Sequence, residues 1–133
     1  MKKLEHIAIA VKNLADANDL FGRLFGKAHY KVEEVASEGV RTSFFEIGGV
    51  KIELLEATNE HSPVARFIEK RGEGIHHLAF EVADIHEAAK QYQRDGFEVI
   101  SAQPKKGADN KLILFLHPKS TNGTLIELCQ EIR

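Results

Sequence analysis

The sequence contains a single cysteine, Cys129, so no disulfide can form within the chain. This absence fits a reducing compartment and predicts a cytoplasmic location. No apolar run approaches the ~20 residues that a membrane-spanning helix needs, and no signal-peptide core follows the first three residues. The net charge of −2 gives no reason to expect a nucleic acid or an anionic membrane. We therefore expect neither a nucleic acid nor a membrane as partner.

The composition is that of an ordinary globular protein, with 43% hydrophobic and 29% charged residues in a chain of 133. A chain of this length can bury a core without disulfides, which predicts one domain over 1–133. Cys129 lies inside an apolar strand pattern, which favours a buried core residue over a nucleophile.

A strand pattern occurs twice, at 6–11 and 77–82, and each copy opens with a histidine followed by alternating residues. An offset of 71 aligns the two copies, and an offset of 74 aligns 51–56 with 125–130. A length change of three residues in a turn reconciles the two offsets. The sequence therefore predicts a duplicated unit.

The duplication predicts an α+β fold of two tandem β-α-β-β-β modules that form one curved, cup-shaped mixed sheet with helices on the outside. Module 1 covers about 1–57, a linker helix about 58–73 and module 2 about 74–133. Alternation and turn residues predict strands at 4–11, 28–35, 41–47, 50–55, 75–82, 97–100, 112–116 and 124–129. Helical periodicity predicts helices at 15–25 and 86–94 and a short helix that begins at Pro63 and ends at Gly72, and 104–110 is expected to be an exposed loop.

Four ionisable residues recur at matching places in the two modules: His6, Glu53, His77 and Glu127. In each strand they lie on the face opposite the apolar core residues, so a pseudo-twofold arrangement points all four into one concavity. Two imidazoles with one or two carboxylates suit a divalent first-row metal. Taken singly, each histidine could be a strand-end residue and each glutamate half-exposed; their recurrence favours the metal site. His76 competes with His77, but the repeat matches His77 to His6.

These features resemble the vicinal oxygen chelate superfamily, which includes glyoxalase I, extradiol dioxygenases and drug-resistance proteins. Within it, the whole chain resembles the methylmalonyl-CoA epimerase family. The resemblance is carried by the segments at 6–11, 53–56, 62–64, 74–79, 115–119 and 123–128. Three of these segments narrow the resemblance from the superfamily to that family: the His76-His77 pair, Phe115-Leu-His-Pro-Lys119 and Gly123-Thr-Leu-Ile-Glu-Leu128.

The resemblance implies an enzyme that interconverts (R)- and (S)-methylmalonyl-CoA by deprotonation and reprotonation at C2, through a metal-stabilised enolate. It implies a divalent ion, Co²⁺ first with Mn²⁺, Ni²⁺, Zn²⁺ or Fe²⁺ as alternatives, a role in propionate metabolism, and a homodimer. Glu53 and Glu127 are the pair that would act as bases as well as ligands. Some members carry a further glutamate in the strand corresponding to 41–43, where this sequence has Arg-Thr-Ser, so whether Glu53 is a ligand, a base or both stays open.

An acyl-CoA thioester needs phosphate contacts, and lysine binds phosphate as a point charge. Lys119 and His117, in the 117–120 loop, are therefore candidate substrate residues, and Lys105, Lys106 and Lys111, in a region expected to be flexible, are further candidates. Other functions stay open: a glyoxalase-type lyase, an extradiol dioxygenase with a two-histidine, one-carboxylate iron site, or a metal-free drug-binding protein.

Overall fold

Two units of similar build form the part of the chain that the computed structural model describes, residues 1–101 and 103–133. The first unit is His6–His76, and the second combines Met1–Glu5 with His77–Arg133. Both contain strands and one long helix in the predicted β-α-β-β-β order, so the α+β class is confirmed. That the two form a single domain stays a prediction.

In the first unit, strand order is β2-β3-β4-β1. Strands β1 and β4 pair in parallel, whereas β2 with β3 and β3 with β4 are antiparallel. The elements are β1 (Lys3–Ala10, which begins in the second unit), α1 (Leu14–Phe25), β2 (Lys31–Val35), the 3-10 turn η1 (Ala36–Glu38), β3 (Val40–Ile47), β4 (Val50–Ala57) and α2 (Pro63–Arg71).

Helix boundaries in this unit follow local chemistry. The Asn13 side chain accepts a hydrogen bond from the Asp16 backbone at the start of α1, and Gly26 ends the helix at a φ of 71°. Ser62 caps α2 in the same way, with Pro63 in its first turn. Among the described residues, no helix is long and apolar enough to cross a membrane.

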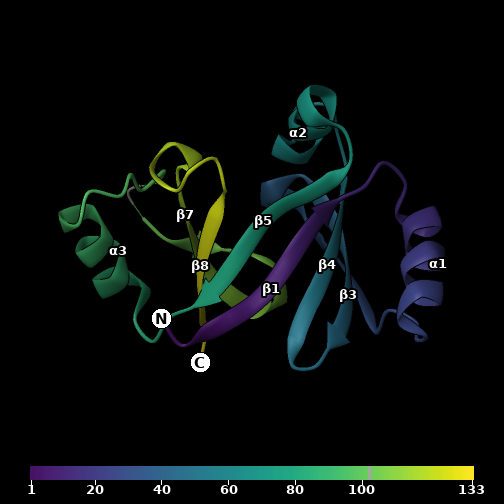
Figure 1. Cartoon of the computed structure of the whole chain (residues 1–133), viewed down its shortest axis with the longest axis horizontal. Helices are drawn as coiled ribbons and strands as arrows, with labels where there is room; N and C mark the ends of the chain where they lie inside the picture. The colour runs from purple at the N-terminus through teal and green to yellow at the C-terminus, as the bar shows by residue number, and fades with distance from the viewer. Residues whose placement is uncertain (102) are drawn as a thin grey trace. The chain divides into compact units, whose positions relative to one another are not determined.

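The two faces of the first sheet carry different helices. Helix α1 lies beside β3 and β4 (Figure 1) and packs with Leu54 and Phe45 on one face. Helix α2 packs through Val64 on the other face, against Ala8 and Leu55. Because side chains alternate along a strand, His6 lies on the face of Ala8, the face that α2 partly covers.

The second unit repeats this pattern with strand order β5-β8-β7-β6. Strands β5 and β8 are parallel, and the other two pairs are antiparallel. Helix α3 packs beside β7 and β8 around Leu114 and Leu128 (Figure 1). The elements are β5 (Gly74–Glu81, which begins in the first unit), α3 (Ile85–Arg94), β6 (Lys105–Lys106), η2 (Ala108–Asn110), β7 (Lys111–Leu116), η3 (Pro118–Ser120) and β8 (Ile126–Glu131).

Two sequence predictions in the second unit were wrong. The strand expected at 97–100 is reduced to an isolated bridge between Val99 and Leu116. Phe97 and Val99 pack against the core beneath α3, so their apolar character reflects this packing and not strand pairing. The expected loop at 104–110 contains the short strand β6 and the turn η2.

Matching hydrogen bonds confirm the duplication. The Val11 N–H donates to the Leu55 carbonyl at 2.9 Å, and 71 residues later the Val82 N–H donates to the Cys129 carbonyl at 2.9 Å. At the start of α1 the Leu14 N–H donates to the Glu56 carboxylate at 2.9 Å. At the start of α3 the Ile85 N–H donates to the Gln130 side-chain oxygen at 2.7 Å. Each module therefore ties its last strand to its long helix in the same way.

Candidate functional site

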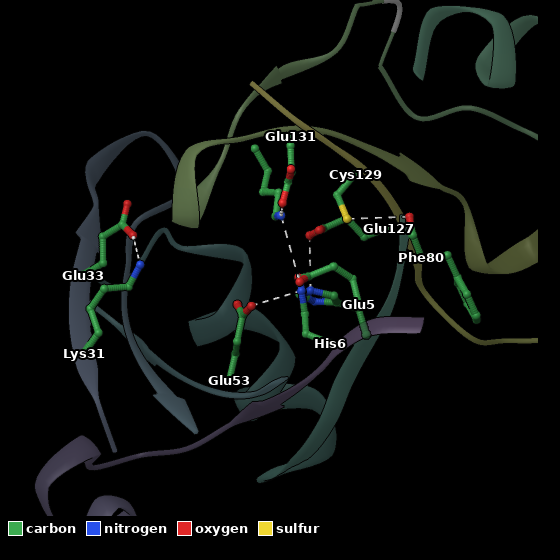
Figure 2. A network of polar contacts seen from close by, with 11 residues as sticks. Glu5, His6, Lys31, Glu33, Glu53, Phe80, Glu127, Cys129 and Glu131 are labelled. Carbon is green, nitrogen blue, oxygen red and sulfur yellow. Dashed lines mark hydrogen bonds and ion pairs between the residues drawn. The ribbon is translucent and has the colours of Figure 1, made fainter. Parts of the chain in front are cut away.

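The first unit brings His6 and Glu53 together. Strands β1 and β4 pair in a register that sets Ala8 beside Glu53, and His6 lies two residues before Ala8 on the same face of β1. His6 Nδ1 lies 3.0 Å from Glu53 Oε2, and both residues are at most 5% exposed. Figure 2 shows the carboxylate pointing at the imidazole.

The second unit repeats the arrangement with His77 and Glu127. Here Ala79 stands beside Glu127 in the parallel pair of β5 and β8. His77 Nε2 lies 3.2 Å from Glu127 Oε1, and both residues are 5% exposed. The imidazole also packs against the Phe115 ring at an interplanar angle of 87°, with centroids 5.5 Å apart. The two histidines present different nitrogens to their carboxylates, Nδ1 in one unit and Nε2 in the other.

Buried imidazole–carboxylate pairs of this kind can do two things. A neutral imidazole and a carboxylate are both ligands for divalent metals, and a carboxylate held in place can also take up and return a proton. A carboxylate is costly to bury unless it is paired or hydrogen-bonded, and the histidine nitrogen beside each glutamate is placed to supply that partner. The structure thus brings each predicted histidine to its predicted glutamate; their joint role as ligands stays a prediction.

His76, the competitor of His77, has a different environment. Its ring packs against Phe67 of α2, with centroids 4.9 Å apart, and it is half-buried. Since neighbouring residues of a strand point to opposite faces, His76 cannot share the face of its neighbour. This packing favours His77 as the functional histidine of the pair.

Cys129 lies on the same face of β8 as Glu127 and is fully buried, which confirms it as a core residue. Its thiol donates to the Phe80 carbonyl at 3.6 Å, as Figure 2 shows. Burial raises the pKa of the Cys129 thiol far above its ordinary range, and the negative charges of Glu127 and Glu5 add to this. The thiol therefore stays protonated and unreactive.

Lys111 is not the flexible phosphate-binding residue that the sequence suggested. It is only 5% exposed, and its Nζ lies 3.4 Å from the Glu131 carboxylate and 4.0 Å from that of Glu5. Strand β7 begins at Lys111, one residue earlier than predicted, so the lysine belongs to the strand and not to the loop before it. The sequence carried no sign of this cluster, because Glu5 is 106 positions away along the chain.

The predicted substrate residues His117 and Lys119 lie together in the turn η3. The Lys119 backbone N–H donates to His117 Nδ1 at 3.0 Å, so the histidine caps the turn. The Lys119 side chain is exposed, whereas His117 is half-buried. The exposed lysine is available to an anionic ligand, and its role in binding one stays a prediction.

A second finding that sequence reasoning missed is the pair of hydroxyls of Thr42 and Ser43 on β3. Both residues are at most 1% exposed, and neither hydroxyl has a hydrogen-bond partner in the described part of the chain. The register of β3 places Thr42 opposite Leu55 and Ser43 opposite Leu54. The one sign of this in the sequence was the presence of polar residues inside the predicted strand 41–47, which precedes the strand that contains Glu53.

Comparisons with known proteins bear on what this site does. Residues 5–115 match the family described as Glyoxalase/Bleomycin resistance protein/Dioxygenase superfamily. The chain is 42% identical over 127 residues to the mitochondrial methylmalonyl-CoA epimerase of Dictyostelium discoideum, covering 95% of this chain and 76% of that protein. It is 41% identical over 130 residues to the ethylmalonyl-CoA/methylmalonyl-CoA epimerase of Cereibacter sphaeroides, covering 96% and 97%.

A solved structure extends the likeness to the fold. A variant of Streptomyces coelicolor methylmalonyl-CoA epimerase, in complex with 2-nitronate-propionyl-CoA, superposes with a TM-score of 0.95 at 32% identity. The match covers 100% of this chain and 99% of that one. Similarity of sequence and fold therefore spans the whole length of both proteins.

Proposed function

Because the chain belongs to the Glyoxalase/Bleomycin resistance protein/Dioxygenase superfamily and, within it, to the methylmalonyl-CoA epimerase family, we propose that it interconverts (R)- and (S)-methylmalonyl-CoA. The observation that carries the proposal is the recurrence of a buried histidine–glutamate pair in each unit, His6 with Glu53 and His77 with Glu127. A proton leaves C2 of the substrate on one face and returns on the other.

The donor atoms of these pairs fit a divalent first-row cation. Imidazole nitrogens and carboxylate oxygens are its preferred ligands, and all four side chains are buried. We propose that His6, Glu53, His77 and Glu127 together bind one such ion, Co²⁺ first, with Mn²⁺, Ni²⁺, Zn²⁺ or Fe²⁺ as alternatives. When bound, the ion supplies positive charge that offsets the negative charge formed when C2 loses its proton, an effect of several kcal/mol.

The proton itself is moved by the chain's own carboxylates. Glu127 and Glu53 each have a second carboxylate oxygen besides the one that faces a histidine, and that oxygen can accept a proton from carbon. General bases placed in this way contribute about 10²–10⁴-fold. Because epimerisation needs a proton to leave one face and return to the other, two carboxylates from two pseudo-symmetric units suit the task. The histidines hold these carboxylates in position.

The test is deuterium uptake at C2 of methylmalonyl-CoA in D₂O, measured with metal-free and cobalt-loaded protein. We expect rapid exchange and racemisation only with the loaded protein, and one ion bound per chain. Two ions per chain would mean that each pair binds its own metal. Loaded protein that exchanges no deuterium would exclude the epimerase; oxygen consumption with a catechol would then point to a dioxygenase.

The finer features of the function are proposals of the same kind. Lys119, with His117 shaping its turn, binds the phosphates of the acyl-CoA, and the protein works as a cytoplasmic homodimer in propionate metabolism. Lys119→Ala should raise KM for methylmalonyl-CoA about 3- to 10-fold, as expected for one exposed charge contact. Lys90→Ala, an exposed lysine on α3 of the same unit, is the matched control. Analytical ultracentrifugation tests the dimer.

A further inference from the structure

Thr42 on β3 carries a buried hydroxyl that makes no hydrogen bond within the described part of the chain. The residue is 1% exposed, and its Oγ1 has no hydrogen-bond partner among the described residues. Buried polar groups are nearly always hydrogen-bonded, because leaving one unsatisfied is destabilising. The Thr42 hydroxyl, without a partner in the described part of the chain, is therefore available to a ligand.

The register of β3 and β4 places this hydroxyl on the functional face. Phe44 stands directly opposite Glu53, and Thr42 stands two residues further along, opposite Leu55. Residues two apart on a strand share a face, so Thr42 is the diagonal neighbour of Glu53, with their Cα atoms about 7–8 Å apart. Ser43 points to the other face of the sheet, the face that α1 covers.

The second unit indicates that the fold itself does not need a hydroxyl at this place. There Phe115 stands opposite Glu127, and Ile113 stands opposite Cys129, in the register that Thr42 occupies in the first unit. Ile113 is 5% exposed, so an apolar side chain fills the equivalent position. The threonine is thus a polar residue at a site where its repeat has a hydrocarbon.

We propose that Thr42 Oγ1 donates a hydrogen bond to a carboxylate oxygen of the acyl-CoA substrate, and so orients C2 relative to Glu53. This rests on the proposed function. A hydroxyl is a poor base, so Thr42 positions the substrate and does not take the proton. Because the acceptor is charged, losing the bond should weaken binding about 10- to 100-fold.

The test compares Thr42→Val, Thr42→Ser and Ser43→Ala in the full-length, metal-loaded protein. Valine matches threonine in shape but lacks the hydroxyl, and serine restores it. Ser43→Ala is the matched control, since it also removes a buried hydroxyl without a partner among the described residues, from the opposite face of the same strand. The readouts are malonyl-CoA affinity by calorimetry, kcat and KM for deuterium exchange, and the midpoint of thermal unfolding.

Thr42→Val should weaken malonyl-CoA binding and raise KM about 10- to 100-fold with an unchanged or higher unfolding midpoint, whereas Thr42→Ser and Ser43→Ala should bind like the wild type. Equal affinity in Thr42→Val, or an equal loss in Ser43→Ala, overturns the proposal. If the wild type binds malonyl-CoA but exchanges no deuterium, the epimerase fails while the affinities still decide the role of Thr42. If the wild type does not bind malonyl-CoA, both proposals fall.

Discussion

The two units place a buried histidine–glutamate pair at the same register, yet the positions around the pairs differ. Where the first unit has Val40 on β3, the second has the buried lysine Lys111 on β7; where the first has Thr42, the second has Ile113. Duplication has kept the groups suited to binding a cation and moving a proton, and has let the flanking positions diverge. The shared residues therefore point to common chemistry, and the differing ones to tasks that each unit performs alone.

The strongest test of this equivalence removes one histidine at a time. If both pairs serve one cation, His6→Ala and His77→Ala should each abolish stoichiometric metal binding and slow deuterium exchange on the order of 1,000-fold, because the charge stabilisation is lost. Metal content by mass spectrometry and exchange by NMR measure the two effects. Retention of half the metal in each variant would instead indicate two independent sites. His76→Ala is the control, because it removes an adjacent imidazole that packs against Phe67 and does not face Glu127.

A second test asks whether both carboxylates move protons. Glutamine keeps an oxygen that can accept a hydrogen bond from histidine but cannot take a proton, so Glu127→Gln and Glu53→Gln separate these roles. We expect each to slow racemisation about 100-fold or more, the usual contribution of a general base. Exchange started from each enantiomer shows which carboxylate serves which face. Normal racemisation in Glu53→Gln would leave Glu53 as a ligand only.

The third test concerns Lys111, whose place in the first unit is taken by Val40. Lys111→Met takes away the cation beside Glu5, which is 4% exposed, and should lower the free energy of unfolding by about 3 kcal/mol. Urea denaturation of the metal-free protein measures the loss. The double variant Glu5→Gln with Lys111→Met should recover part of it, because the buried charge is then gone. An unchanged stability in Lys111→Met would mean that the ion pairs contribute nothing to folding.

The sequence predicted local features well and distant contacts poorly. Alternation placed each histidine and glutamate on one strand face, and helical periodicity placed the end of α1 at residue 25, since both depend on neighbouring residues. The strand expected at 97–100 failed because apolar residues packed under a helix have the same pattern as paired ones. The surroundings of Lys111, and a Thr42 hydroxyl without a hydrogen-bond partner among the described residues, follow from the pairing of distant strands, which alternation alone does not determine.

The smallest expected difference between the units lies where their helices begin. Glu56 accepts the Leu14 N–H with a charged oxygen and also pairs with Arg41, whereas Gln130 accepts the Ile85 N–H with a neutral one. Charged hydrogen bonds contribute more, so Glu56→Ala should cost about 2 kcal/mol of unfolding free energy and Gln130→Ala about 1 kcal/mol. Urea denaturation monitored by circular dichroism distinguishes the two. Gln130→Glu adds a negative charge at the N-terminus of α3 and should raise the free energy of unfolding, which would bring the contribution of this residue closer to that of Glu56. If Gln130→Glu lowers the free energy of unfolding instead, a neutral oxygen is required at this position.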